Sequence, residues 1–298
     1  MAILLVIPFL AILCVITLVL ALKKRWKLAV VTFFVALIIN VLTETFPLRF
    51  TTMSENDSSE VTVFAYNVHG SGKDYDEKQE DIARLILSES PDVAFLCEFP
   101  LYKNFRLDSI LTKENGYTQY YQSGTNCVFY SKYAIDSIIG IYSPASNNKY
   151  SLNNKVHVFM EHDTLTIVGC HLSSSNHHIQ EGYNRRRMEA DAIYACIMDE
   201  HHPVIVMGDM NDISGSYAIH RIKKAGLEDA WWKGGLGYGT TFHKGGLRLR
   251  LDHVLYDKDY LALRHVKVID SDLSDHNALV VRFDFNRHED NKPLPYSY

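Results

Sequence analysis

The sequence predicts an α/β domain in which helices cover buried β-sheets, preceded by an apolar N-terminal segment. From Val61 onward, apolar runs rich in β-branched and aromatic residues alternate with segments of helical periodicity, which is typical of α/β proteins. Several of these runs are almost continuously apolar, as in strands that are buried on both faces. The first 22 residues carry no charge, which sets them apart from the rest of the chain.

The N-terminal segment, residues 1–50, predicts a membrane anchor of two transmembrane helices in contact with lipid. The uncharged run 1–22 is long enough to cross a bilayer, which requires about 20 apolar residues. A shorter apolar run, 28–42, follows the basic stretch 23–27. The positive-inside rule keeps this basic stretch in the cytoplasm. A helical hairpin then makes the remaining chain extracytoplasmic, either periplasmic or on the external face.

Two alternatives to this hairpin stay open. In the first alternative, the two apolar runs form a pair of buried core helices. In the second, the second run is too short to span the membrane, and the domain is cytoplasmic. A cleaved signal peptide is the weaker interpretation, because the segment has neither a basic start nor a small-residue cleavage site.

Beyond the anchor, the chain divides into a polar linker (51–60), a catalytic domain (61–285) and a tail (286–298). Strands are expected over 61–68, 92–99, 126–132, 156–162, 164–172, 203–209, 251–257 and 277–285. Helices are expected over 78–90, 184–200 and 217–226.

Polar side chains lie at the boundaries of six of these apolar runs. An ordinary turn explains the stretch GDMND at 208–212 by itself, but it does not explain the same layout at five other strand ends. In packed sheets such ends meet at one rim, so we expect these side chains to converge. The residues concerned are Asn67, Glu98, His171, Asp209, Asn211, Asp252, His253, Asp275 and His276.

These residue types suit a reaction at phosphorus. Carboxylates and carboxamides are the oxygen ligands that Mg²⁺ prefers, and a bound divalent cation neutralises charge that develops on a phosphoryl oxygen. An aspartate beside a water molecule can align it or remove its proton. A histidine paired with an aspartate is held charged and offers a hydrogen bond to phosphate. The pattern therefore predicts metal-assisted hydrolysis of a phosphate ester.

Six short motifs, in this order, resemble those of the endonuclease/exonuclease/phosphatase superfamily: YNVHG, FLCEF, CHLSSS, GDMND, RLDHVLY and SDHNALVV. This superfamily includes deoxyribonuclease I, abasic-site endonucleases, neutral sphingomyelinases and inositol-polyphosphate 5-phosphatases. Each motif is weak individually, whereas six in order over about 61–285 form a specific signal. The resemblance implies a four-layer α/β sandwich, in which two packed mixed β-sheets are flanked by helices.

The resemblance also implies a metal centre. Glu98 corresponds to the main ligand of Mg²⁺, with Mn²⁺ as an alternative ion, while Asn67 lies close by and Asp275 supports the site. His69 stands two residues after Asn67, where some members carry an acid that helps to bind metal. This departure leaves open whether the chain holds one metal ion or two.

Five further residues correspond to the catalytic groups of the superfamily. Asp209 positions or deprotonates the attacking water, and Asn211 holds that water or a phosphate oxygen. His171 contacts the scissile phosphate. His276 stabilises the developing charge or transfers a proton, and Asp252 orients His276. Which group acts as the general base stays open.

Two segments have both a structural and a functional interpretation. The arginines at 185–187 either lie on a solvated helix face or contact phosphate through one of their guanidinium groups. The Gly-rich stretch 231–246 is either a surface loop or a flap over the substrate.

Three functions remain after these assignments. The first is a membrane-tethered, metal-dependent phosphodiesterase or phosphatase acting on nucleic acid, a phospholipid headgroup or a small phosphoester. The second is an extracytoplasmic nuclease that degrades DNA or RNA, and the third is a catalytically idle binding protein on the same fold. Residues 51–298 carry 25 basic and 34 acidic side chains, which disfavours long polyanions because affinity for a phosphate backbone depends on Lys and Arg. No obligate protein partner is implied.

Overall fold

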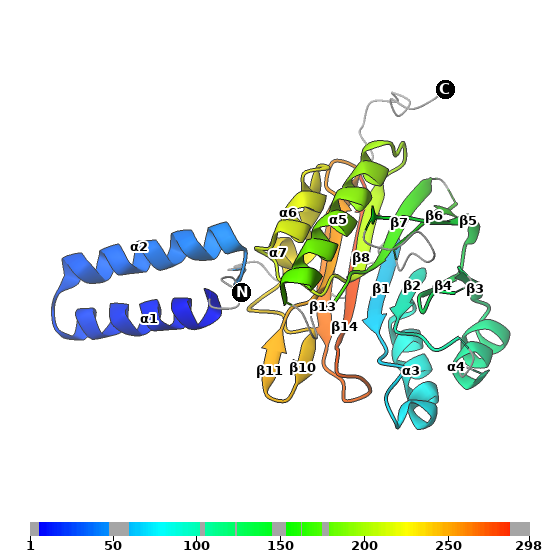
Figure 1. Ribbon diagram of the computed structural model, residues 1–298, viewed down its shortest axis with the longest axis horizontal. Helices are drawn as coiled ribbons and strands as arrows, with labels where there is room; N and C mark the ends of the chain where they lie inside the picture. The colour runs from blue at the N-terminus through cyan, green and yellow to red at the C-terminus, as the bar shows by residue number, and fades with distance from the viewer. Residues whose placement is uncertain are drawn as a thin grey trace.

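The computed structural model describes residues 6–47, 60–101, 105–122, 124–144, 153–161, 163–174 and 179–286. These residues form a pair of helices and, beside it, a layered α/β body (Figure 1). Most of the expected linker, 51–59, and the expected tail beyond Asn286 lie outside the described residues.

The body contains two six-stranded mixed β-sheets. The first has the order β13 (Leu261–Ile269), β14 (Ala278–Phe285), β1 (Val61–Asn67), β2 (Val93–Cys97), β4 (Val128–Ser131) and β3 (Thr118–Tyr121). The second has the order β5 (Ala134–Gly140), β6 (Asn154–Phe159), β7 (Thr164–His171), β8 (Val204–Asp209), β12 (Asp252–Asp257) and β9 (Leu227–Asp229). Within each sheet one central pair is parallel, β1 with β2 and β7 with β8, and the other pairs are antiparallel.

Helices cover the outer faces of both sheets, which gives four layers (Figure 1). The first sheet packs against α3 (Tyr75–Glu89) and α4 (Phe105–Ser109), which continues into a π-helical turn (Ile110–Glu114). The second sheet packs against α5 (Ile179–Met198) and α6 (Tyr217–Lys223). The elements α7 (Ala230–Gly234), β10 (Phe242–Lys244) and β11 (Leu247–Leu249) complete the body. This arrangement confirms the predicted four-layer sandwich.

The main core lies between the two sheets. Inward side chains of the first sheet, such as Phe95 and Phe129, pack there with Met207 and Val254 of the second. Strands β1, β2, β4 and β8 are buried along their whole length, which accounts for their continuous apolar runs. Gly169 in β7 permits the close approach, since a Cβ there would lie 2.3 Å from the ring of Phe95.

All eight expected strands and all three expected helices are present. Six other strands in the described part of the chain were not predicted, and four of them, β3, β5, β9 and β13, are the edge strands of the two sheets. Two of these edges are irregular, with register shifts in β5 between Ile135 and Ile138 and in β13 between Leu263 and His265. An irregular, half-exposed edge strand lacks the regular apolar pattern on which sequence assignment depends.

The N-terminal helices α1 (Val6–Leu22) and α2 (Trp26–Thr43) run antiparallel beside the body (Figure 1). A hydrogen bond of 2.8 Å joins the hydroxyl groups of Thr17 and Thr32 across the pair. Among the described helices, α2 alone is long and apolar enough to cross a membrane. Glu44, directly after α2, accepts a hydrogen bond from Nζ of Lys223 at 2.6 Å, so the end of the pair contacts the body.

Candidate active site

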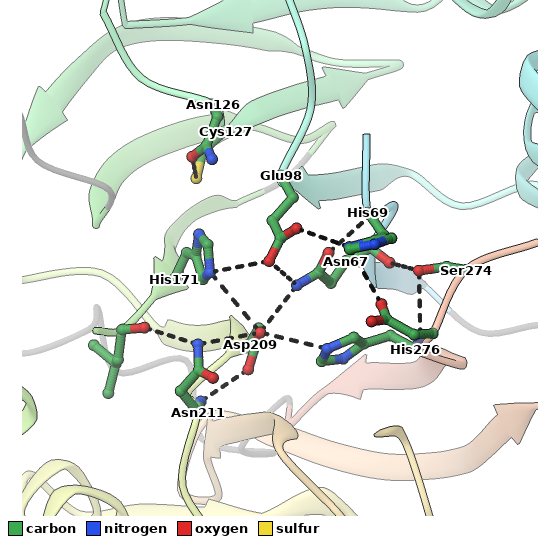
Figure 2. Close-up of polar contacts among 12 residues, drawn as sticks. Asn67, His69, Glu98, Asn126, Cys127, His171, Asp209, Asn211, Ser274 and His276 are labelled. Carbon is green, nitrogen blue, oxygen red and sulfur yellow. Dashed lines mark hydrogen bonds and ion pairs between the residues drawn. The ribbon is translucent and has the colours of Figure 1, made fainter. Parts of the chain in front are cut away.

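The expected site residues converge because the central strands of both sheets have an end at one rim; His253 is the exception, since its side chain is buried against Arg250 and Asp229. In the second sheet, Asp209 at the end of β8 has a partner on each neighbouring strand. His171 of β7 pairs with it on one side, and Asp252 of β12 pairs with it on the other. In the first sheet, Asn67 at the end of β1 lies beside Cys97 at the end of β2. Glu98 is the residue directly after Cys97, so it lies at the same rim. Asn67 and Asp209, which are 142 positions apart in the chain, are therefore hydrogen bonded across the two sheets (Figure 2).

Asn67 connects the acidic groups of the two sheets. Its Nδ2 donates to Oε1 of Glu98 at 3.1 Å and to Oδ2 of Asp209 at 3.0 Å (Figure 2). Its Oδ1 accepts the backbone N–H of His69 at 3.0 Å. Nε2 of His171 lies 3.8 Å from Glu98 Oε1 and 3.9 Å from Asp209 Oδ2. The amide group of Asn67 thus orients both carboxylates, while its oxygen is already hydrogen bonded.

The turn after β8 fixes the carboxylate of Asp209. Gly208 has φ +129°, and a Cβ there would lie 2.2 Å from the carbonyl oxygen of Cys170, so only glycine fits this close approach. Oδ1 of Asp209 accepts the backbone N–H of Asn211 at 2.8 Å. Asn211 has φ +47°, a conformation in which asparagine is enriched, and its Nδ2 donates to the carbonyl of Leu172 at 2.9 Å. The stretch GDMND is therefore both a turn and part of the site.

His276 and Asp252 form a buried pair beside Asp209. Nδ1 of His276 lies 2.7 Å from Oδ2 of Asp252, and Nε2 lies 3.8 Å from Oδ2 of Asp209. Burial disfavours the charged imidazolium, but the charges of Asp252 and Asp209 outweigh it and raise the pKa of His276 from 6.5 to about 9. The ring of Phe242 packs against the imidazole with a centroid separation of 5.0 Å. His276 is consequently a cation at neutral pH with one ring nitrogen directed at Asp209.

Asp275, Glu98 and His69 meet on the other side of the site. Nδ1 of His69 lies 3.2 Å from Oε2 of Glu98 and 3.5 Å from Oδ1 of Asp275. Oδ2 of Asp275 accepts a hydrogen bond from Nζ of Lys244 at 2.8 Å. Partial burial would raise the pKa of the Asp275 carboxyl, but Lys244, His69 and His276 together hold this pKa below its usual value. Asp275 is therefore ionised.

The groups described above open onto a pocket of about 700 Å³. One wall of this pocket is apolar, and its side chains come from the loops after β7 and β8 and from the β10–β11 hairpin. The apolar side chains of this wall include Leu172, Ile213, Phe242, Leu247 and Leu249. Another part of the lining, the acidic wall, contains Glu98, Asp209 and Asp275. The pocket can thus hold an organic group next to the acidic centre.

The acidic wall fits a divalent cation. Its carboxylate oxygens are hard donors, and both Glu98 and Asp275 lie within 3.5 Å of the same nitrogen of His69. A second group, Asp209, Asp252 and His276, has ligand atoms within 4.8 Å of one another. There, however, the charged imidazole of His276 already neutralises the carboxylate to which it is hydrogen bonded. Glu98 and Asp275 therefore form a second candidate place for a cation, and there Lys244 pairs with Asp275.

Three functional candidates were missed or left undecided by the sequence. Of the three arginines at 185–187, Arg186 is buried and lines the pocket. Its Nη1 donates to the carbonyl of Ser173 at 2.8 Å, and its Nε donates to Asp212 at 3.1 Å. Phe242 and Lys244 also line the pocket, so the Gly-rich segment contributes side chains to the site. The only sequence signal for Phe242 and Lys244 was the presence of an aromatic and a basic residue within a Gly-rich stretch.

Solved structures share this fold at low sequence identity. Humanised D. rerio TDP2 superposes with a TM-score of 0.62 and 18% identity, covering 76% of this chain and 100% of that one. The 3′ phosphatase NExo from Neisseria, solved with a product DNA hairpin, gives a TM-score of 0.57 and 14% identity over 75% and 99% of the two chains. The human Nocturnin catalytic domain, solved with a sulfate anion, gives 0.60 and 18% over 76% and 94%.

Comparison of the sequence itself gives the family. No curated protein matches the chain. Residues 64–276, well over half of the chain, match the Endonuclease/Exonuclease/phosphatase family. This span begins within β1 and ends at His276, so it includes every predicted site residue. The chain belongs to the endonuclease/exonuclease/phosphatase family.

Proposed function

We propose that the chain is a metal-dependent hydrolase of phosphate esters in which Asp209 positions the attacking water. The placement of Asp209 carries this proposal. Its carboxylate is 1% exposed, held by Asn67 and Asn211, and faces the imidazolium of His276 at 3.8 Å. A hydrogen-bond acceptor and a cationic donor thus stand side by side at the base of a pocket, as attack of water on phosphorus requires.

Each neighbouring side chain then has a role that its contacts support. Oδ2 of Asp209 accepts a hydrogen bond or a proton from water, and Nε2–H of His276 donates to a phosphate oxygen as negative charge develops there. Asp252 keeps His276 charged and fixes its orientation. Asn211 and His171 lie beside Asp209, where their polar atoms can contact the phosphate. A divalent cation held by Glu98 and Asp275, with Asn67 close by, would neutralise further charge on the phosphate.

Hydrolysis should depend on the metal. The full-length chain, purified in detergent, is expected to release p-nitrophenol from bis-p-nitrophenyl phosphate in the presence of Mg²⁺ or Mn²⁺. EDTA should abolish this release, because it removes the charge-neutralising ion, and excess Mg²⁺ or Mn²⁺ should restore it. Turnover that continues undiminished in EDTA would contradict the proposal.

The same assay, extended to natural esters, separates the remaining functions. Plasmid DNA, RNA, sphingomyelin and inositol phosphates each represent one substrate class, and p-nitrophenyl phosphate distinguishes a monoesterase from a diesterase. Cleavage of DNA or RNA alone would favour the nuclease alternative. No turnover of any ester, with the metal bound, would favour the idle binding protein.

We further propose that the helix pair tethers the catalytic domain, residues 61–285, to a membrane. Apolar side chains of α2 remain exposed beside the body, for example Phe33 at 55% and Leu42 at 68%, and a bilayer would cover them. With the basic residues 23–27 cytoplasmic, both ends of the pair face the other side. Alkaline phosphatase fused after Tyr298 should therefore be active in the periplasm of a bacterial host, whereas a fluorescent cytoplasmic reporter there should stay dark. The opposite pair of results would reverse the orientation.

A further inference from the structure

We propose that the substrate is a phosphate ester of a membrane lipid, whose hydrocarbon chain lies against the apolar wall while its phosphate reaches Asp209 and His276. The proposal rests on the hydrolase function proposed above and names the substrate class of the same pocket. Three observations support it: the composition of the β10–β11 hairpin, the place where the helix pair contacts the body, and the pairing of the basic side chains in the lining.

The β10–β11 hairpin turns one face towards the pocket, and that face is mostly apolar. Phe242 pairs with Leu249 across the hairpin and Lys244 pairs with Leu247, so these four side chains lie on the same face. All four line the pocket, whereas the residues that alternate with them in the two strands do not. The ring of Phe242 contacts His276, so this apolar face begins directly at the candidate catalytic group.

The same wall extends to the surface of the protein. Leu247 is 51% exposed and Ile179, at the start of α5, is 60% exposed, and because both line the pocket they lie at its mouth. Leu172 and Leu249, which belong to the same wall, are buried. Single exposed leucines are ordinary on a protein surface, whereas apolar side chains gathered in one pocket are typical of a binding site. A hydrocarbon chain lying here would remove this apolar surface from water.

The residues that follow α2 are fixed against the loops that form this pocket. The side-chain amide of Asn40 donates to the carbonyl of Phe46 and accepts its backbone N–H, both at 2.8 Å, which ties these residues to the helix. The ring of Phe46 packs on Tyr238 with a centroid separation of 5.6 Å. A Cβ at Gly215 would lie 3.3 Å from the carbonyl oxygen of Thr43, the last residue of α2.

These contacts place the apolar wall beside the end of the proposed membrane anchor. Gly215 lies in the same loop as Ile213, which lines the pocket. The hydroxyl of Tyr238 accepts the backbone N–H of Arg250 at 3.3 Å, and Leu249, directly before Arg250, also lines the pocket. The hairpin lies on the side of the body that faces the helix pair (Figure 1). With α2 in a bilayer, the apolar wall is therefore close to the lipid surface.

The charges of the lining suit a single phosphate group better than a nucleic acid strand. A bound strand is held by a series of Lys and Arg contacts to its phosphates. Among the described lining residues, Lys244 and Arg186 are the Lys and Arg, and each is paired with a carboxylate, Lys244 with Asp275 at 2.8 Å and Arg186 with Asp212 at 3.1 Å. A lipid ester brings one phosphate group and uncharged hydrocarbon, which matches an acidic centre beside an apolar wall.

Esters that differ only in their hydrocarbon chain test the proposal. The full-length protein in detergent, with Mg²⁺ or Mn²⁺, is assayed with ethyl p-nitrophenyl phosphate and octyl p-nitrophenyl phosphate, two diesters that release p-nitrophenol. The octyl ester should have a kcat/KM at least about tenfold higher, because each methylene that leaves water can add up to about fourfold. Equal values for the two esters would overturn the proposal.

Two variants show whether the apolar wall causes this preference. Leu247→Gln and Ile179→Gln should each lower the octyl-to-ethyl ratio of kcat/KM by about threefold or more, because the chain loses apolar contact. Both positions are exposed, so the fold should persist, which circular dichroism checks. Leu236→Gln is the matched control, since Leu236 is 73% exposed in the same Gly-rich stretch but does not line the pocket, and its ratio should equal that of the wild-type protein. A wild-type ratio in both wall variants would assign the preference to partition into detergent and overturn the proposal.

A vesicle assay tests whether the ester comes from the membrane. The full-length protein, reconstituted into phosphatidylcholine vesicles that contain hexadecyl p-nitrophenyl phosphate, should release p-nitrophenol from this membrane-held ester. Cleavage of the ethyl ester without cleavage of the membrane-held ester would overturn the lipid substrate and leave the hydrolase function intact. Cleavage of plasmid DNA or RNA without any preference for the octyl ester would do the same. Absence of hydrolysis of every ester would instead overturn the proposed function itself.

Discussion

Asp209→Asn is expected to lower kcat for bis-p-nitrophenyl phosphate by about 10²- to 10⁴-fold, the usual contribution of a general base. The substitution keeps the size of the side chain and an oxygen that can accept the N–H of Asn211, so the turn after β8 should persist. It removes the negative charge that faces His276 and the basicity needed to take a proton from water. Because the group acts on the reaction more than on substrate binding, KM should change little.

Asp257→Asn provides the matched control for this variant. Asp257 ends β12 at the opposite rim from Asp252, outside the pocket, and its carboxylate accepts the backbone N–H of Asp259 at 3.1 Å. An asparagine oxygen can accept the same bond, so kcat should stay close to that of the wild-type protein. Near-normal kcat in Asp209→Asn, with unchanged circular dichroism, would contradict the assignment of Asp209 to the attacking water.

Arg250→Met is expected to destabilise the fold by about 3–5 kcal/mol, the usual effect of removing one partner from a buried ion pair. Arg250 is 1% exposed, and its guanidinium donates to Asp229 at 3.0 Å and to the hydroxyl of Ser214. Nη1 of Arg250 also lies 3.0 Å from Nδ1 of His253. Full burial would raise the pKa of Asp229, but Arg250 and His253 hold this pKa far below its usual value. Methionine fills similar space without the charge, so a buried carboxylate would lose its main partner.

The linkage to pH follows from the direction of this shift. The pKa of Asp229 is lower in the folded state than in the unfolded chain. Its contribution to folding stability is therefore fully present at a pH above the ordinary pKa of aspartate. That contribution is lost only as the pH falls well below this ordinary pKa. The loss in Arg250→Met should therefore be largest near neutral pH and should shrink in acid. Thermal unfolding followed by circular dichroism at several pH values measures both effects.

The double variant Arg250→Met/Asp229→Asn shows whether the unpaired charge causes the loss. The introduced asparagine keeps an oxygen that can accept the N–H of Trp232, as Asp229 does at the start of α7, but it carries no charge. The double variant should recover part of the lost stability. If it is no more stable than Arg250→Met, an unpaired carboxylate is not the cause. The same cluster also contacts the active-site loop, because Nε2 of His253 lies 2.9 Å from the carbonyl oxygen of Asp212.

The interior strands and most of the site were predictable because both leave a local signal. Strands β1, β2 and β8 are buried on both faces, and a strand without a solvated face must be apolar along its length. A polar residue that ends such a run, as Asn67, Glu98 and Asp209 do, is conspicuous without any knowledge of its neighbours. These residues were therefore found from the sequence, and strand register brings them together as expected.

The four edge strands and the buried ion pair left no comparable signal. An edge strand pairs on one side only and remains partly exposed, so its sequence is mixed, as in β13 with its exposed Arg264 and buried His265. Nothing local in the sequence shows that Arg250 and Asp229 will be enclosed with each other. Long-range partners alone decide their burial.

The sequence by itself determined the interior strands, the residues at their ends and the family to which the chain belongs. Tertiary structure alone decided what lies over that rim: the β10–β11 hairpin that carries Lys244 to Asp275, the one arginine of three that reaches the pocket, and the contact of His69 with two carboxylates. The physical reason is that apolar periodicity is a property of neighbouring residues. The contacts over the rim depend on backbone geometry and register between segments that lie up to about two hundred positions apart.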